Sequence, residues 1–198
     1  MKPRVAIACQ GGGSQTAFTA GVLKALFENR VQDRVNLVSL SGTSGGAICA
    51  FLLWYALRKG DDCLWKRLID FWLDNTAQTP QERLFNDSII KTLESASRGM
   101  IPQYNLSPSS PLVKTWFSMA TRGMRSRFTD FTELLATHID FSELAAWGAQ
   151  PEPPILIIGA CNILTGRLHK FSSYKESMRI EHPLASACVP SIFPAVTL

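Results

Sequence analysis

The sequence predicts an α/β fold with a mainly parallel central sheet, and three observations carry this prediction. Apolar runs at residues 5–9 and 35–40 are each followed by a glycine-rich turn and a segment with helical apolar spacing. Residues 155–160 return to a strand pattern late in the chain. Strand–helix units joined by short turns form parallel sheets with right-handed crossovers, so we expect one such sheet.

The first half of the chain alternates expected strands and helices. A strand at residues 5–9 is followed by a turn at residues 10–14 and a helix at residues 15–29. The apolar residues that recur at helical spacing in this helix are Phe18, Val22, Leu23, Leu26 and Phe27. A second strand at residues 35–40 precedes a helix at residues 44–57, which is apolar nearly all round and is therefore expected to be buried.

A helical insertion is expected between about residues 61 and 150. Its predicted helices lie at residues 61–75, 82–95 and 112–120. The first of them is amphipathic, with an apolar face made of Leu64, Leu68, Phe71 and Trp72. Asp130 is the expected N-cap of a further helix, with Glu133 at the capping-box spacing. Insertions of this kind often form the roof of a pocket above the carboxyl ends of parallel strands.

The last part of the chain returns to strand patterns. Residues 155–160 and 167–171 are expected to pair as a hairpin around a Thr-Gly turn, and residues 182–188 to form a helix. Residues 195–198 have the pattern of a strand that continues. We therefore expect residues 1–198 to be a single domain without its C-terminal part.

Composition and charge argue against several classes of protein. The formal net charge is only +4 and the basic residues are spread along the chain, so nucleic acid is not an expected partner. The five cysteines are widely spaced and include no C-x-x-C pair, as in a reducing compartment. No cluster of His, Cys or acidic residues has ligand spacing, so we expect no metal and no cofactor. The longest apolar run, residues 47–57, is too short for a membrane span, which favours a cytoplasmic protein, with peripheral membrane contact as an option.

The stretch Gly42-Thr43-Ser44-Gly45-Gly46 fits the pattern G-x-S-x-G between a strand and a helix. A serine hydroxyl becomes a nucleophile only when it is exposed, rigidly held and beside a base. Gly42 and Gly46 allow the tight nucleophile elbow that holds such a serine in a strained conformation, and the helix N-terminus favours developing negative charge. The alternative is a close-packed turn in which Ser44 is only an N-cap.

A second glycine run, Gly11-Gly12-Gly13, also lies between an expected strand and helix. In a parallel sheet both turns emerge at the carboxyl edge, so glycine amides can point at an oxyanion beside Ser44. The competing interpretation is a dinucleotide fingerprint, with Glu28 or Asp33 as its acidic residue. That fingerprint lacks its third glycine, because position 16 is threonine, and it leaves the serine motif unexplained.

Together the two motifs resemble those of the patatin-like phospholipases, lipid acyl hydrolases with a Ser-Asp dyad. Members begin with a strand, a glycine-rich turn and a helix, and carry G-T-S-x-G after the next strand. Residues 155–166 are similar to the family's central strand and turn, and residues 185–194 to the segment before its catalytic aspartate. The resemblance implies a patatin-like three-layer fold with Ser44 as the nucleophile and the first glycine turn as the oxyanion hole.

Two departures from the family pattern concern the site. The family turn G-G-G-x-[RK]-G has Gln15 and Thr16 at its last two positions here. The family's base is the aspartate of a D-G-[GA] motif, and this sequence has no Asp-Gly, so the expected base lies beyond Leu198. No other residue is a convincing base, since the histidines His138, His169 and His182 are more often structural and the acidic residues belong to no motif.

A lipid ester or another ester is the substrate that the resemblance implies, and it needs an apolar groove. The aromatic candidates in the insertion, which can equally be core residues, are Trp65, Phe71, Trp72, Phe85, Trp116, Phe117, Phe128 and Phe131. Arg122, Arg125 and Arg127 form a basic loop that is either solvated or in contact with phosphate head groups.

The favoured function is therefore a serine lipid acyl hydrolase, of phospholipase A or esterase type, that cleaves carboxylic esters through an acyl-enzyme. Two alternatives stay open. One is a catalytically silent lipid- or partner-binding domain on the same fold, and the other is a nucleotide-binding α/β module.

Overall fold

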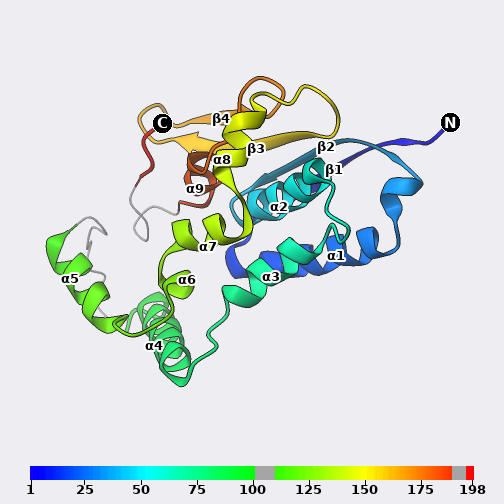
Figure 1. Cartoon of the computed structure of the whole chain (residues 1–198). Coiled ribbons are helices and arrows are strands. Elements are labelled where there is room, and N and C mark those ends of the chain that lie inside the picture. Colours follow the sequence, from blue (N-terminus) through cyan, green and yellow to red (C-terminus); the bar gives the residue numbers. More distant parts are fainter. Residues whose placement is uncertain (101–109, 189–194) are drawn as a thin grey trace.

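The structure is a computed structural model that describes residues 1–100, 110–188 and 195–198. Along the chain (Figure 1) its elements are β1 (Arg4–Cys9), η1 (Gly13–Thr16), α1 (Ala17–Glu28), η2 (Val31–Asp33), β2 (Asn36–Thr43), α2 (Gly45–Lys59), α3 (Lys66–Asp74), α4 (Pro80–Ser97), α5 (Pro111–Ala120), α6 (Ser126–Thr129), α7 (Phe131–His138), α8 (Phe141–Trp147), β3 (Ile155–Asn162), β4 (Arg167–Ser172) and α9 (Glu181–Ala187). No helix among the described residues has the length and hydropathy that a bilayer span requires. Residues 189–194, the larger part of the segment 185–194 that is similar to the family, lie outside the description.

The described strands form one sheet in the order β1-β2-β3-β4. β1, β2 and β3 run parallel, whereas β3 and β4 pair as an antiparallel hairpin. The α/β fold with a mainly parallel sheet is therefore confirmed, and so is the hairpin. β2 continues past the predicted end at residue 40, because Ser41, Gly42 and Thr43 still pair with β3.

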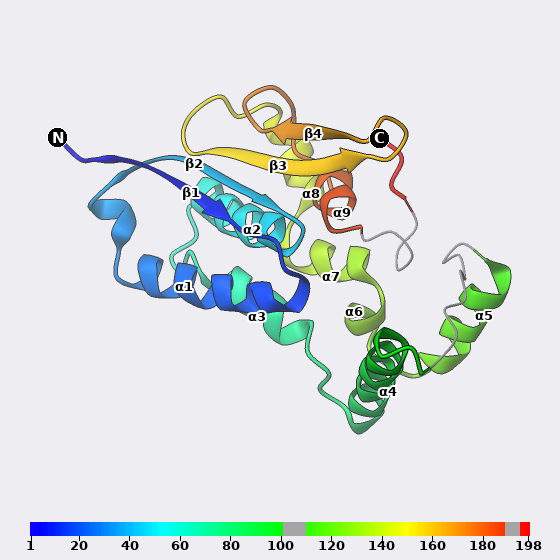
Figure 2. The same cartoon turned by 180° about the vertical axis from the view of Figure 1, so that it is seen from behind.

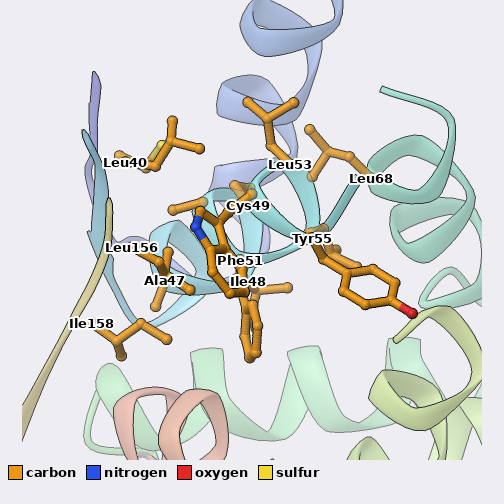
Figure 3. Close-up of a cluster of buried hydrophobic side chains, with 14 of the residues drawn as sticks. Leu40, Ala47, Ile48, Cys49, Phe51, Leu53, Tyr55, Leu68, Leu156 and Ile158 are labelled. Carbon is orange, nitrogen blue, oxygen red and sulfur yellow. The ribbon is translucent and has the colours of Figure 1, made fainter. Parts of the chain in front are cut away.

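One face of the sheet carries the hydrophobic core. Leu40, Leu156 and Ile158 are buried on this face, and Figure 3 shows them directed toward α2. Every residue of α2 from Gly45 to Ala56 is buried, as its uniformly apolar sequence predicts. This helix contacts β1, β2 and β3, so its N-terminus is held rigidly at the edge where β2 ends.

The opposite face of the sheet carries small and polar side chains. Ala6 and Ala8 of β1 are exposed, and their register partners Ser39 and Ser41 of β2 are half-buried. Figure 2 looks onto this face, and no described helix lies in front of the strands. The described helices therefore pack on one face of the sheet, and the third layer that the family resemblance implies is not seen among the described residues.

The predicted apolar face of α1 is only partly correct. Leu23 and Phe27 are buried, but the third buried residue of the helix is Ala20. Phe18, Val22 and Leu26 lie on an exposed side. The buried side faces α2 and α3, where a small residue allows close helix contact.

The helices of the insertion lie close to their predicted positions. α3 begins at Lys66 rather than at residue 61, after a turn that opens with Gly60, the C-cap of α2, at a φ of 73°. Leu68 and Phe71 of the predicted face are buried. Asp130 is confirmed as the N-cap of α7 and accepts hydrogen bonds from the amides of residues 132 and 133.

The expectation of a solvated or phosphate-binding basic loop is wrong for Arg125, which is half-buried, whereas Arg122 and Arg127 are exposed as a solvated loop would have them. Arg125 makes a two-pronged ion pair with the buried Glu82, with Nε 2.8 Å from Oε1 and Nη2 2.9 Å from Oε2. Arg127 pairs with Asp74 at 3.1 Å, and Arg122 stays exposed. Glu82 is the capping-box residue of α4, so one carboxylate secures both the start of α4 and the segment that leads to α6.

The Glu82–Arg125 pair predicts acid sensitivity of the insertion. Hydrogen bonds from Arg125 are the chief reason that the pKa of Glu82 falls from its ordinary 4.5 to about 2. The folded state then binds fewer protons than the unfolded state, so this stabilisation is complete above pH 4.5 and is lost as the pH falls toward 2. Glu82→Gln should lower the free energy of unfolding at pH 7 by about 3 kcal/mol.

Urea titrations at pH 7 and pH 3 check this expectation. The variant should lose less stability between these two pH values than the wild type does. The matched control is Asp87→Asn, which changes an exposed carboxylate on the same helix and should leave the unfolding midpoint at pH 7 unchanged. Equal midpoints for Glu82→Gln and the wild type at pH 7 would contradict the role given to the pair.

Candidate active site

Ser44 stands alone between the end of β2 and the start of α2, with φ 55° and ψ −132°. A positive φ is strained for a residue with a Cβ and costs about 1–3 kcal/mol, so the surroundings must enforce it. The Ser44 side chain makes no capping hydrogen bond to α2. The interpretation of Ser44 as only an N-cap therefore gains no support. The residue is half-buried, so its hydroxyl is held in place without being sealed in the core.

The glycines around Ser44 are required by backbone packing. A Cβ on Gly42 would lie 2.3 Å from the Gly46 carbonyl oxygen, and one on Gly46 would lie 2.3 Å from the Cys9 carbonyl oxygen. Gly45, which the sequence analysis did not single out, is equally constrained, with the Thr16 hydroxyl oxygen 2.1 Å from its Cβ position. The turn can therefore form only with glycine at these three positions.

The structure brings the first glycine turn against Ser44. The Cβ position of Gly11 lies 2.7 Å from the Thr43 carbonyl oxygen and 3.3 Å from the Cβ of Ser44. Gly13 has φ 57°, which again favours glycine, whereas a side chain on Gly12 would meet nothing closer than 3.8 Å. Steric demands thus explain Gly11 and Gly13, but they do not explain Gly12.

The amides of this turn are available as donors. Within the described part of the chain, the N–H groups of Gly11 and Gly12 donate to no backbone or side-chain acceptor. The amides of Gly13 and Ser14 open the short helix η1 and so have no acceptor inside it. Free amides beside a rigid serine are the feature that an oxyanion needs.

Ser186 of α9 is a residue that the sequence analysis missed. Its hydroxyl accepts a hydrogen bond from the Ser44 amide at 2.8 Å and donates one to the Gly159 carbonyl of β3 at 2.6 Å. The strained serine is thereby tied to a neighbouring strand and to a helix 142 residues later. The only signal in the sequence is that Ser186 lies in the segment 185–194 quoted for the family resemblance, and that segment names no partner.

Two of the three histidines, and the acidic residues Asp74 and Asp140, have structural partners. His182 is fully buried and stacks on Phe171 with ring centroids 4.3 Å apart, and burial lowers its pKa. His138 is buried against Asp74, with Nε2 3.2 Å from Oδ2, and burial likewise lowers its pKa. Asp140 caps α8. Among the described residues no group of three or more His, Cys, Asp or Glu is placed to hold a metal ion.

The dinucleotide interpretation gains no support from the first turn. Thr16, at the position of the third glycine, is buried and donates its hydroxyl hydrogen to the Gly13 carbonyl at 2.6 Å. Asp33 pairs with Arg30 at 2.7 Å. Thr16 therefore packs between the two turns, where its hydroxyl fixes Gly13 and its Cβ contacts Gly45.

Seven of the eight aromatic candidates divide into two groups, and Phe128, which is half-buried, belongs to neither. The members that belong to the core or pack against it are Trp65, Phe71, Trp72 and Phe131. Phe85 of α4 and Phe117 of α5 instead make an edge-to-face pair with centroids 6.1 Å apart, and Trp116 beside them is exposed. Only the α4–α5 group is thus free of the core as a surface for an apolar ligand.

The packing around Gly46 predicts opposite effects for two glycine-to-alanine changes. Gly46→Ala should lower the free energy of unfolding by about 3 kcal/mol or more, because its methyl group would overlap the Cys9 carbonyl. Gly21→Ala, in the open middle of α1, should raise that free energy by about 0.5–1 kcal/mol. Chemical denaturation of both variants checks the contrast, and equal midpoints would refute the packing described here.

Comparison with known proteins gives one match. The family model described as Patatin-like phospholipase matches residues 7–198, which includes both glycine turns, β3 and Ser186. Neither the search of curated proteins nor the search of solved structures finds a match. The match spans nearly all of the chain, and the chain therefore belongs to the patatin-like phospholipase family.

Proposed function

We propose that the protein is a serine acyl hydrolase that cleaves carboxylic esters of lipids with Ser44 as nucleophile. Membership of the family supports lipid acyl hydrolase activity in general. The observation that supports the serine mechanism is the contact of Gly11 with the strained Ser44, because the Gly11 and Gly12 amides of the same turn donate to no described acceptor. A structural turn would need neither the strain nor the unpaired donors.

In the proposed reaction, Ser44 Oγ attacks the ester carbonyl carbon and loses its proton to a base. The negative charge moves to the carbonyl oxygen, where the amides of the Gly11–Gly13 turn donate hydrogen bonds to it. Each such donor is worth roughly 10²–10³ in rate. Collapse of the intermediate expels the alcohol and leaves an acyl-serine, which water cleaves with help from the same base.

The base is proposed to be a carboxylate, the aspartate that the family resemblance implies, and residues 1–198 contain no Asp-Gly. In support, four of the described acids that the sequence analysis weighed are engaged elsewhere. Asp130 and Asp140 cap helices, and Asp61 and Asp74 pair with arginines. A single carboxylate that performs all proton transfer must lie within hydrogen-bond reach of Ser44 Oγ.

The two buried cysteines near the elbow do not compete as nucleophiles. Burial raises the pKa of Cys9 to about 11 and that of Cys49 to about 12. Both thiols therefore stay protonated at neutral pH, and a thiol is a far weaker nucleophile than its thiolate. Neither buried thiol is therefore an alternative to Ser44 as the nucleophile.

Ser44→Ala in the full-length protein should reduce hydrolysis of a short p-nitrophenyl ester by roughly 10³-fold or more, because no other nucleophile replaces the hydroxyl. Ser39→Ala on the same strand serves as the matched control and should retain wild-type turnover. A serine-directed fluorophosphonate should label Ser44 in the wild type, as peptide mass spectrometry would show. Unchanged ester turnover in Ser44→Ala would remove the proposal.

Ser186 is proposed as a positioning residue for Ser44. Ser186→Ala leaves the Ser44 amide without its acceptor, so kcat for the soluble ester should fall about tenfold, the effect of about 1.4 kcal/mol, while KM stays nearly unchanged. The control is Ser177→Ala, another half-buried serine, whose hydroxyl donates to the Leu144 carbonyl at 2.9 Å. Equal kcat in Ser186→Ala and Ser177→Ala would exclude the positioning role.

A further inference from the structure

The turn between β3 and β4 exposes two aliphatic side chains that its own structure does not require. Ile163 is 67% exposed and Leu164 is 91% exposed. The turn is held by Asn162, whose Oδ1 accepts the amides of Leu164 at 3.0 Å and Thr165 at 3.2 Å. Because the backbone and Asn162 define this conformation, Ile163 and Leu164 are displayed on a rigid tip.

The tip lies at the edge of the sheet that carries the candidate active site. β2 and β3 are parallel, with Thr43 opposite Gly159, so both strands end on the same side. Figure 2 shows the β3–β4 turn on the side of the sheet where β2 leads into α2. Phe18, on the first turn of α1 after the glycine run, is 79% exposed. Exposed apolar side chains thus follow the ends of β1 and β3, on either side of Ser44.

Contacts connect the tip to the surroundings of Ser44. Leu168 of β4 is 67% exposed and lies on the open face of the sheet, opposite Cys161. The Cβ position of Gly159 lies 3.6 Å from Cδ1 of Leu168 and 2.9 Å from the hydroxyl oxygen of Thr43. Gly159 therefore lies between the exposed Leu168 and Thr43, the residue before the proposed nucleophile.

The charged residues of the β3–β4 hairpin are all basic. Between Glu152 and Glu176 the sequence contains no acidic residue. Arg167 at the start of β4 and Lys170, three residues further along the strand, are both exposed. An aliphatic tip flanked by unopposed cations matches an anionic membrane surface, in which leucine side chains enter the acyl region and cations stay with the phosphates.

We propose that the β3–β4 tip, formed by Ile163 and Leu164 with Arg167, Lys170 and Leu168 behind it, docks the protein on an anionic lipid bilayer with Ser44 facing the lipid. This inference builds on the proposed function, because it delivers the ester substrate to that site. A small convex tip buries too little area for a stable protein–protein interface, which needs roughly 1,200 Å² or more, whereas insertion into a bilayer needs only its side chains.

Vesicle flotation of the full-length protein tests the docking directly. The wild type should bind vesicles of phosphatidylcholine with phosphatidylserine more tightly than vesicles of phosphatidylcholine alone. Leu164→Asp should weaken binding about tenfold to hundredfold, because it removes one inserted aliphatic side chain. Lys170→Glu should weaken binding to the phosphatidylserine vesicles at least about fivefold and leave binding to the neutral vesicles nearly unchanged.

The matched control is Tyr174→Asp, which changes a 58% exposed residue just after β4, at the opposite end of the hairpin. It should bind vesicles as the wild type does. Wild-type protein that does not float with the vesicles, or Leu164→Asp that floats as well as the wild type, would overturn the proposal.

The soluble p-nitrophenyl ester separates this failure from failure of the catalytic proposal. Leu164→Asp should turn over that ester at the wild-type rate, because the tip does not touch the reacting atoms, but should cleave vesicle phospholipid more slowly. If instead Ser44→Ala stays active on the soluble ester, the nucleophile is wrong whatever the vesicles show. Flotation needs no catalysis, so it tests only the membrane docking. Turnover of the soluble ester tests only the role of Ser44 as nucleophile.

Discussion

Backbone-to-backbone packing of two glycine turns is the constraint on which the site depends. The Cβ positions of Gly46 and Gly11 are occupied by carbonyl oxygens from the opposing turn, so neither turn can close if a side chain intervenes. The turns come from adjacent parallel strands, with Cys9 opposite Gly42. Ser44, directly after this contact, has a positive φ, and the Gly11 and Gly12 amides donate to no described acceptor.

Burial of α2 supplies the rigidity that such a strained turn requires. The helix lies between the sheet and α3, and its residues from Gly45 to Ala56 are inaccessible to solvent. Trp54 also anchors the far half of the helix, by a 2.8 Å hydrogen bond from its indole to the Pro154 carbonyl. Relaxing the Ser44 backbone would require this packed helix to shift, so core packing and site geometry are mechanically coupled.

The local patterns of the sequence predict the sheet, the order of its elements and the two turns, because each depends on a few consecutive residues. What they miss depends on long-range contacts. Arg125 pairs with a glutamate 43 residues away, and Ser186 reaches Ser44 across 142 residues. The buried side of α1 was misjudged for the same reason, since Ala20 is chosen by the neighbouring helices rather than by its own hydrophobicity.

The central claim is that the amides of the first glycine turn face the oxygen of a group bound to Ser44. A crystal structure of the full-length protein after reaction with a fluorophosphonate tests this claim most directly. The account predicts a phosphoryl oxygen 2.7–3.1 Å from at least two amide nitrogens of the Gly11–Gly13 turn, the usual range for an oxyanion hole. A phosphoryl oxygen that points to solvent, or an adduct on another residue, would contradict it.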